Sequence, residues 1–253
     1  MTENKSNRSE AFSIRLADKI IRIEPMFDEI KEYCKEYITD GKPDVSVRVE
    51  DEDIAYEWES SIKEAKLEGN ISVNYTDAYL ETLAVYRQIA EKVLMYDTVL
   101  FHGSVIAVDG EGYLFTAKSG TGKSTHTRLW REYFGSRAVM VNDDKPLLKV
   151  TEDGVYAYGT PWNGKHRLST NISVPLKAIC ILTRAEDNSI EEIRPKEAYQ
   201  MLLQQTYRPK DNKAMIQTLE LIDKIMKKTR FYRLGCNREL EAAKVAFEGM
   251  TKN

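Results

Sequence analysis

The N-terminal part of the chain alternates apolar and polar residues over short stretches, which is the pattern of strands with one buried face. Residues 12–16 and 20–23 flank a polar turn and predict a hairpin. Strict alternation over residues 45–49 predicts another strand. These short strands indicate a small sheet near the start of the chain.

Helical spacing of apolar residues follows in the same part of the chain. Apolar residues between positions 27 and 38 recur at helical intervals, and residues 77–95 carry a strong apolar stripe. The acidic segment 50–68 has no clear period, so we interpret its charges as a solvated face. We therefore expect residues 1–96 to form an α+β region that packs on the rest of the chain.

Hairpins dominate the pattern in residues 97–253. Residues 98–116 predict two strands around a Gly-rich turn, and a helix is expected from Lys123 to Gly135. Tightly joined strands pair antiparallel, so we expect an α/β fold, mixed α+β in order, with a mixed and largely antiparallel sheet. Further strands are predicted at 138–141, 147–150, 155–158, 176–182, 190–193 and 231–234, and helices at 196–206, 214–228 and after an N-cap at Asn237.

A glycine-rich stretch at residues 114–125 carries the clearest chemical signal. Its strand–loop–helix order matches the second half of the phosphate-loop template Gly-x-x-x-x-Gly-Lys-Ser/Thr, with Ala117 in place of the first glycine. Loop amides and the following helix start can bind phosphate, a lysine can reach the β- and γ-phosphates, and a serine hydroxyl can ligate Mg²⁺. The alternative is a turn that binds nothing. The residues expected to bind nucleotide are Ser119, Gly120, Thr121, Gly122, Lys123, Ser124, Thr125 and Lys165.

Two adjacent aspartates, Asp143 and Asp144, follow a short apolar strand about twenty residues after Ser124. Phosphoryl transfer needs a carboxylate on Mg²⁺, and transfer to a hydroxyl benefits from a second carboxylate as base. Neighbouring side chains of an extended strand point in opposite directions, so one aspartate could face the metal and the other the acceptor. The alternative is a solvated Asp-Asp turn.

Histidines and a basic loop complete the candidate residues. His102 precedes the glycine-rich stretch and is either functional or a structural hydrogen-bonding residue, whereas we expect His126 to be structural. Residues 165–167 read Lys-His-Arg in a Gly-bounded loop, which suits closure over a γ-phosphate or an anionic substrate. A solvated basic turn is the alternative.

These motifs together resemble the catalytic core of bacterial HPr kinase/phosphorylase and, more distantly, ATP-dependent phosphoenolpyruvate carboxykinase. The resemblance covers residues 98–182 and rests on three segments in order, which are 101–103, 117–124 and 141–144. It implies the mixed α/β core that those families share. It also implies that Lys123 holds phosphates, that Ser124 and Asp144 hold the metal, that Asp143 is the catalytic base, and that His102 lies beside the transferred phosphate.

Outside this core the sequence departs from true HPr kinases. The regions before Leu94 and after Val150 do not reproduce theirs, and residues 159–164, Gly-Thr-Pro-Trp-Asn-Gly, look instead like the motif of small relatives of HPr kinase. Those relatives stand near kinases of free serine, of small polyols and of serines in peptide precursors.

Composition limits the partners. The formal net charge of −3 provides no basic field for nucleic acid or an anionic membrane. Three cysteines without metal-like spacing, no signal-peptide pattern and no long apolar run favour a cytoplasmic protein without a disulfide framework. Self-association into a homo-oligomer is compatible with the sequence.

The function we expect is that of a kinase, a phosphotransferase that uses ATP and Mg²⁺ to phosphorylate an alcohol hydroxyl. Asp143 would deprotonate the acceptor, which is a hydroxyl-bearing small molecule or a serine in a peptide or protein, and Arg167 or Lys165 would neutralise developing charge. Two alternatives are a nucleotide-binding regulatory module without acceptor phosphorylation and an HPr-type protein serine kinase/phosphorylase. A carboxykinase is disfavoured because the chain is short for that family's substrate site.

Overall fold

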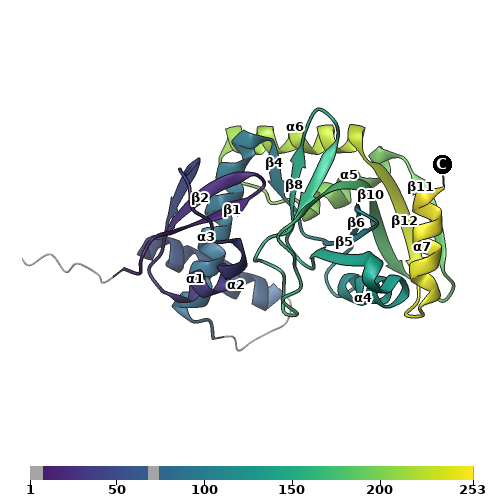
Figure 1. Ribbon diagram of the computed structural model, residues 1–253, viewed down its shortest axis with the longest axis horizontal. Helices are drawn as coiled ribbons and strands as arrows, with labels where there is room; N and C mark the ends of the chain where they lie inside the picture. The colour runs from purple at the N-terminus through teal and green to yellow at the C-terminus, as the bar shows by residue number, and fades with distance from the viewer. Residues whose placement is uncertain (1–7, 68–73, 253) are drawn as a thin grey trace, which may run out of the picture. The chain divides into compact units, whose positions relative to one another are not determined.

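The computed structural model describes residues 8–67 and 74–252, and Figure 1 shows its elements by label. The chain divides into two compact units, residues 1–92 and residues 93–253. Each unit has a sheet of its own. None of the helices in the described ranges is long and apolar enough to cross a lipid bilayer.

A three-stranded sheet organises the first unit. The predicted hairpin forms from β1 (Phe12–Leu16) and β2 (Lys19–Glu24), and β3 (Val45–Arg48) pairs with β2 in the parallel direction. Residues 27–38, expected to form one helix, form only α1 (Glu29–Tyr33) and the 3₁₀ turn η1 (Lys35–Tyr37). Buried Ile14, Ile21 and Ile23 form the inner face of the sheet.

The acidic segment is a helix, so its interpretation as no more than a solvated face is incomplete. It forms α2 (Asp51–Leu67), beside α3 (Asp77–Val93). The guanidinium of Arg87 on α3 pairs with Asp53 at 2.6 Å and Glu57 at 2.5 Å, and Glu57 is only 8% exposed. These long-range ion pairs on one face of α2 explain why its apolar period is weak.

The second unit is built on a mixed sheet, which confirms the expected α/β class. Its path runs β4-β8-β9-β10-β6-β5-β7, and β12 pairs with β10 and β11. Among the described strands of this second sheet, only the β10–β6 and β10–β12 pairs are parallel, and the other pairs are antiparallel. The strands are β4 (Thr98–Leu100), β5 (Ser104–Val108), β6 (Glu111–Thr116), β7 (Ala138–Asn142), β8 (Leu147–Val150), β9 (Val155–Tyr158), β10 (Ser173–Arg184), β11 (Ser189–Ile193) and β12 (Arg230–Cys236).

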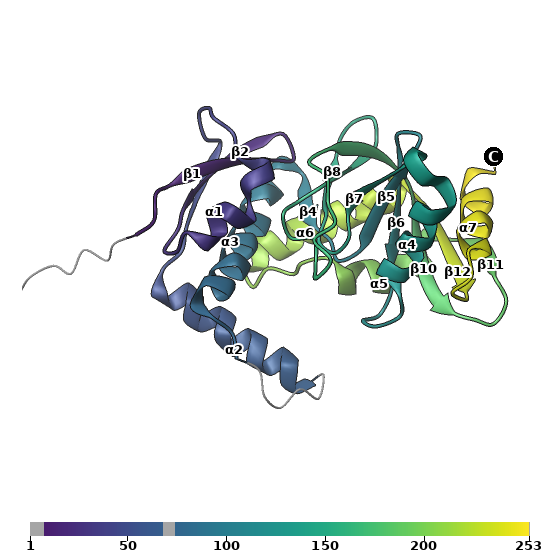
Figure 2. The same ribbon diagram turned by 60° about the horizontal axis from the view of Figure 1, so that its bottom comes forward.

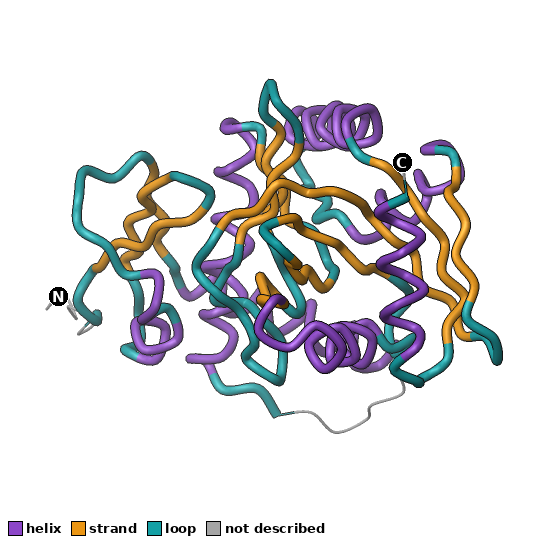
Figure 3. Tube along the Cα trace, turned by 45° about the vertical axis from the view of Figure 1, so that its right-hand side comes forward, coloured by secondary structure: helices purple, strands orange, loops and turns teal. Residues whose placement is uncertain are grey.

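Helices cover both faces of this sheet. Alternate strand residues divide into two buried clusters, one under α5 (Pro195–Gln205) and α6 (Asn212–Lys228), the other under α4 (Lys123–Phe134) and α7 (Glu241–Thr251). Trp130 of α4 is fully buried and packs in tilted or edge-on geometry against the rings of Tyr113, Phe115 and Phe247. Figures 2 and 3 show α4 and α7 side by side, on the same face of the sheet. Successive residues of the strands therefore point to opposite faces of the sheet, and both faces are buried under helices.

Two local expectations in the second unit are wrong. Residues 98–116 form three strands rather than two, because the chain breaks at residues 101–103, where the N–H groups of Phe101 and Gly103 donate to the carbonyls of Pro146 and Asp144. Asn237 does not cap α7, which begins at Glu241 after Leu240. The Asn237 side chain donates instead to the carbonyl of Glu186 at 2.9 Å and so ties β12 to the β10–β11 turn.

Candidate functional site

The glycine-rich loop (residues 117–122) joins the end of β6 to the start of α4. Gly120 and Gly122 have φ of +73° and +122°, a region in which a side chain would be strained. Gly122 is the residue before α4 and offers no side-chain cap. The first N–H groups of α4 therefore have no capping acceptor, and together with the helix dipole they favour an anion at this point.

Lys123 opens α4 and is half-buried. Burial lowers its pKa below the ordinary lysine value, while the negative charges of Asp144 and Asp143 act in the opposite direction. An anion beside the ammonium group would raise the pKa of Lys123, in the same direction as the two aspartates. Lys123 is thus an incompletely compensated cation between the loop and the two aspartates.

Asp143 is the buried member of the pair, at 5% exposure. Its Oδ1 accepts from the Ser104 hydroxyl at 3.0 Å and from the Thr127 hydroxyl at 3.4 Å, and the Ser124 side chain also hydrogen-bonds to it. Burial raises the pKa of Asp143, although the Ser104 and Ser124 hydrogen bonds and the charge of His166 oppose the rise. This carboxyl therefore retains a proton more readily than an ordinary aspartate does.

Asp144 differs from its neighbour in exposure and in pKa. Its side chain is 30% exposed, and its Oδ1 lies 3.3 Å from Nε2 of His102. Burial opposes ionisation of Asp144, but the His102 hydrogen bond and the charges of Lys145 and Lys123 outweigh it, so the pKa lies below the ordinary aspartate value. Asp144 therefore loses its proton more readily than Asp143 does.

Backbone contacts fix where the strand that carries the aspartates ends. The Asn142 side-chain oxygen accepts from the N–H groups of Asp144 and Lys145, at 2.9 Å and 2.7 Å, and its amide donates to Thr160. This turn bends the chain directly after β7. The two carboxylates consequently lie on a turn after β7 and do not continue the extended strand.

The loop at residues 159–170 packs against that bend. At Gly159 an added Cβ would lie 2.0 Å from the carbonyl oxygen of Thr170, so only glycine fits. The N–H of Asp143 donates to the Leu168 carbonyl at 3.0 Å, and an added Cβ at Gly164 would lie 3.1 Å from Cβ of Asp144. The loop that carries the basic residues therefore lies directly over the aspartates.

The three basic residues of this loop are exposed. His166 is close enough to Asp143 for its charge to act on that carboxyl, and Arg167 has a left-handed backbone with φ of +51°. Lys165 lies on the same exposed turn. The loop thus brings positive charge to the edge of the site, near the place where the aspartates lie.

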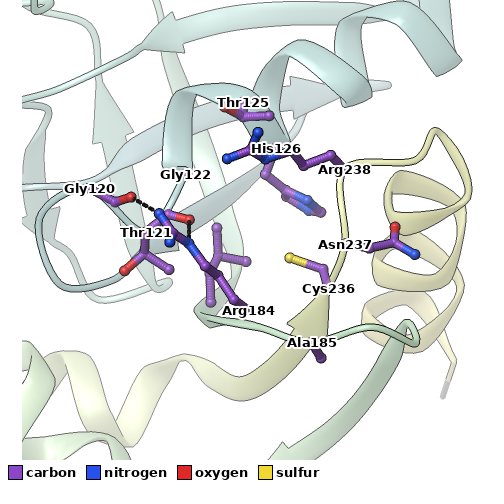
Figure 4. A pocket seen from close by; sticks show the side chains of 11 residues that line it. Gly120, Thr121, Gly122, Thr125, His126, Arg184, Ala185, Cys236, Asn237 and Arg238 are labelled. Atoms are coloured by element: carbon purple, nitrogen blue, oxygen red, sulfur yellow. Dashed lines mark hydrogen bonds between the residues drawn. The ribbon is translucent and has the colours of Figure 1, made fainter.

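A cavity of about 410 Å³ lies on another side of the glycine-rich loop. Figure 4 shows its walls, which come from the loop, the start of α4, the end of β10 and the connection from β12 to α7. The Arg184 guanidinium donates to the carbonyls of Gly120 at 2.6 Å and Thr121 at 3.4 Å. None of the described lining residues is acidic. We refer to this pocket as the arginine-lined cavity, after Arg184 and Arg238.

His126 forms part of the wall of the arginine-lined cavity and is 2% exposed. Its Nε2 accepts from the indole N–H of Trp130 at 3.0 Å, while Nδ1 has no hydrogen-bond partner among the described residues. Burial lowers the pKa of His126 to about 3, so the ring is neutral at pH 7. The sequence analysis took His126 as structural, and its bond to Trp130 accounts for only one of its nitrogens.

The structure brings most of the sequence-predicted residues together. Lys123 acts electrostatically on both aspartates, and His102 contacts Asp144. Ser124, expected to share a metal with Asp144, hydrogen-bonds to Asp143. Ser119 and Lys165 are exposed on their loops, while Gly120, Thr121, Gly122 and Thr125 line the arginine-lined cavity.

Sequence reasoning missed Ser104, Arg184 and Arg238. Ser104 is fully buried, and its hydroxyl hydrogen-bonds to the backbone carbonyl and to the carboxylate of Asp143. The two arginines come from positions far along the chain. None of the three lies in a motif. A buried hydroxyl in an otherwise apolar strand was the single available signal, at Ser104.

Comparison with known families places the chain. The family model described as "SynChlorMet cassette protein ScmC" matches residues 72–236, which is more than half of the chain, so this protein belongs to the ScmC family. No curated protein matches the sequence. Among solved structures, the chain is similar to the HPr(Ser) kinase/phosphatase from Coxiella burnetii, with 11% identity and a TM-score of 0.34. That match covers 59% of this chain and 94% of the other.

The donor set suits magnesium better than a metal held by protein alone. No group of three or more His, Cys, Asp or Glu residues in the described part of the chain could hold a metal ion. Mg²⁺ is ordinarily bound by one or two carboxylates, by waters and by substrate phosphates. Asp144, ionised and partly exposed, and the hydroxyl of Ser124 fit that requirement.

Proposed function

We propose that this protein is an ATP- and Mg²⁺-dependent kinase that transfers the γ-phosphate to an alcohol hydroxyl. The observation that carries the proposal is the meeting of Lys123, at the uncapped start of α4, with the two aspartates at the end of β7. A lysine and free helix amides suit phosphate, and adjacent carboxylates of opposite pKa shift suit a metal ligand and a base. A turn that binds nothing would not need these partners.

The two aspartates would divide the chemistry. Asp144, whose pKa is lowered, would hold Mg²⁺ together with the Ser124 hydroxyl, and His102 would orient its carboxylate from 3.3 Å away. Asp143, whose pKa is raised, would accept the proton of the attacking hydroxyl, with Ser104 and Thr127 fixing its position. The magnesium ion, when bound, would neutralise charge on the phosphate oxygens.

The loop at residues 159–170 would supply the remaining positive charge. Arg167 and Lys165 are exposed on a turn whose neighbours Gly164 and Leu168 contact the aspartates. Charge developing on the transferred group would be stabilised by cations already placed at this edge. The acceptor, a small hydroxyl compound or a serine of a peptide or protein, would approach from the same edge.

Calorimetric titration with ATP and Mg²⁺ tests the binding half of the proposal. We expect Lys123→Ala to weaken binding about 10- to 100-fold, because it removes a charge-assisted contact to phosphate. Lys118→Ala, at an exposed position of the same loop, is the matched control and should bind like the unaltered protein. Equal affinities for ATP in folded Lys123→Ala and unaltered protein would refute the phosphate site.

Release of nucleoside diphosphate in the presence of alcohols, amino acids and serine-containing peptides tests the transfer half. Acceptor-dependent release that requires Mg²⁺ would support the kinase. Tight ATP binding without turnover on any acceptor would favour the regulatory nucleotide-binding module instead. The HPr-type alternative predicts release with HPr itself as acceptor.

A further inference from the structure

The arginine-lined cavity shares the glycine-rich loop with the proposed phosphate site, but its remaining walls take no part in the proposed transfer chemistry. Its eleven lining residues include the turn of the glycine-rich loop but neither aspartate. Its volume of about 410 Å³ is within the usual range for small-molecule pockets. A nucleotide whose phosphates lie on the loop amides must place its nucleoside somewhere beside the loop, and this cavity adjoins it.

An unpaired hydrogen-bond donor lies in the wall of the cavity. The indole N–H of Trp130 can only donate, so Nε2 of His126, 3.0 Å away, must accept and the ring proton must be on Nδ1. That Nδ1–H is buried and has no partner among the described residues. A buried donor without an acceptor is costly, so an acceptor supplied by a ligand would be favoured.

A second feature of the cavity, the cation Arg238 near the start of α4, also favours a bound anion. Figure 4 shows the Arg238 side chain extending from the β12–α7 connection toward Thr125 on the first turn of α4. No hydrogen bond or ion pair to another described residue holds its guanidinium. Arg238 is exposed, so its repulsion by the positive end of the α4 dipole is small, and an anion between the two would turn this repulsion into attraction.

We propose that the arginine-lined cavity takes the adenine and ribose of a bound nucleotide, and that the Nδ1–H of His126 donates a hydrogen bond to a ring nitrogen of the base. The inference rests on the proposed nucleotide site and extends it to the identity of the base. Arg238 contacts the phosphate nearest the ribose, between the cavity and the start of α4. His126 is in this view a specificity-determining residue.

The chemistry of the cavity wall favours adenine over guanine. Adenine presents unprotonated ring nitrogens that accept from a donor such as His126 Nδ1–H. The discrimination applies on the Watson–Crick edge, where adenine has an unprotonated N1 but guanine carries N–H donors at N1 and N2, and those donors need a carboxylate or another strong acceptor. The charged side chains among the described lining residues are Arg184 and Arg238, both of which are donors. Guanine would therefore leave donors facing donors.

Binding measurements on the unaltered protein separate the nucleoside from the phosphates. We expect ATP to bind at least about tenfold more tightly than GTP or inorganic tripolyphosphate, each with Mg²⁺, in calorimetric titrations. ATP that binds no more tightly than tripolyphosphate, or GTP that binds as tightly as ATP, would overturn this inference and leave the phosphate site standing. No binding of any of the three would overturn both.

Alkylation of Cys236 reports whether the cavity is filled. Cys236 lines the cavity and is partly exposed, whereas Cys34 and Cys180 are buried. We expect ATP to slow alkylation of Cys236 at least about threefold, measured by mass spectrometry at saturating ligand, while tripolyphosphate leaves the rate unchanged. Equal protection by ATP and tripolyphosphate, or no protection by bound ATP, would place the nucleoside elsewhere.

Two isosteric variants test the donor itself. His126→Gln places an acceptor where Nε2 accepts from Trp130 but removes the donor at Nδ1, and we expect ATP affinity to fall about three- to tenfold with tripolyphosphate affinity unchanged. His126→Asn keeps an N–H near the Nδ1 position and should hold ATP affinity within about threefold. An unchanged ATP affinity in His126→Gln would overturn the role of His126.

A spectroscopic measurement covers the case in which either variant fails to fold. In unaltered protein labelled with ¹⁵N-histidine, we expect the Nδ1–H signal of His126 to shift on addition of ADP and not on addition of tripolyphosphate. A His126 signal unaffected by saturating ADP would contradict the hydrogen bond to the base.

Discussion

The aspartate cluster (His102, Ser104, Asp143 and Asp144) and the arginine-lined cavity adjoin the same loop but differ in how their polar groups are satisfied. In the cluster, Oδ1 of Asp143 accepts from the Ser104 and Thr127 hydroxyls, and Oδ1 of Asp144 contacts His102. In the cavity, Nδ1 of His126 has no partner among the described residues. This difference fits the two proposals, which are a preorganised site for phosphoryl transfer in the cluster and a ligand-binding pocket in the cavity.

Of the substitutions that test this comparison, replacement of the buried aspartate, Asp143, should have the largest effect, which is a loss of turnover. Asp143→Asn keeps a side-chain acceptor for Ser104 but cannot take a proton at neutral pH, so turnover should fall about 10²–10⁴-fold while ATP–Mg²⁺ affinity is retained. Steady-state kinetics and calorimetry measure the two quantities. Asp153→Asn, in the exposed turn between β8 and β9, is the control and should behave like the unaltered protein. Recovery of the Asp143 variant with Mn²⁺ would show that Asp143 acts through the metal.

The exposed aspartate should fail in a different way. Asp144→Asn retains an oxygen ligand but loses the charge, so we expect the Mg²⁺ concentration for half-maximal activity to rise about tenfold and the defect to ease with Mn²⁺. Titration of activity against each metal ion measures this shift. If metal ions did not ease the Asp144→Asn defect but did rescue Asp143→Asn, then Asp143 would be the metal ligand and Asp144 the base.

On the cavity side, Arg184 should affect affinity rather than turnover. Its guanidinium holds the carbonyls of Gly120 and Thr121, so Arg184→Ala should loosen the loop and weaken ATP binding about three- to tenfold. Arg233→Ala, which removes an arginine paired with Glu191 on the neighbouring strand β11, away from the loop, is the control. If both variants bind ATP equally well, Arg184 does not position the loop.

The smallest expected effect is a pH dependence of stability from His126. In the unfolded chain this histidine takes a proton near its ordinary pKa of 6.5, but in the folded protein only near a pKa of about 3. Between those values the unfolded state binds more protons, so the free energy of unfolding falls as pH decreases below about 6.5 and is unaffected above it.

Urea unfolding at pH 7 and pH 5 measures this contribution. From pH 7 to pH 5 the unaltered protein should lose about 2 kcal/mol more than His126→Gln, which has no titrating group at that position. Equal losses in the two proteins would show that the folded protein admits a proton to His126.

The sequence by itself determined the elements whose signal is local. The strand–loop–helix order at residues 114–134 follows from an apolar run, two glycines and a helical stripe that ends at Gly135. In the structure β6 ends at Thr116 and α4 runs from Lys123 to Phe134. The hairpins β1–β2 and β8–β9 follow in the same way from alternation and turn residues. Neighbouring residues along the chain decide these features, so a single sequence is sufficient to find them.

Tertiary structure alone decided the surroundings of the candidate site. Which aspartate is buried depends on Ser104, 39 residues away, and on the bend that Asn142 makes with Thr160. In the acidic segment, Asp53 and Glu57 of α2 pair with Arg87 of α3, which no local pattern indicates. The arginine-lined cavity joins residues 120–126, 182–185 and 236–238, which no periodicity connects. Contacts between distant residues carry no signal in one sequence, because any polar residue can pair with many others until the fold selects its partner.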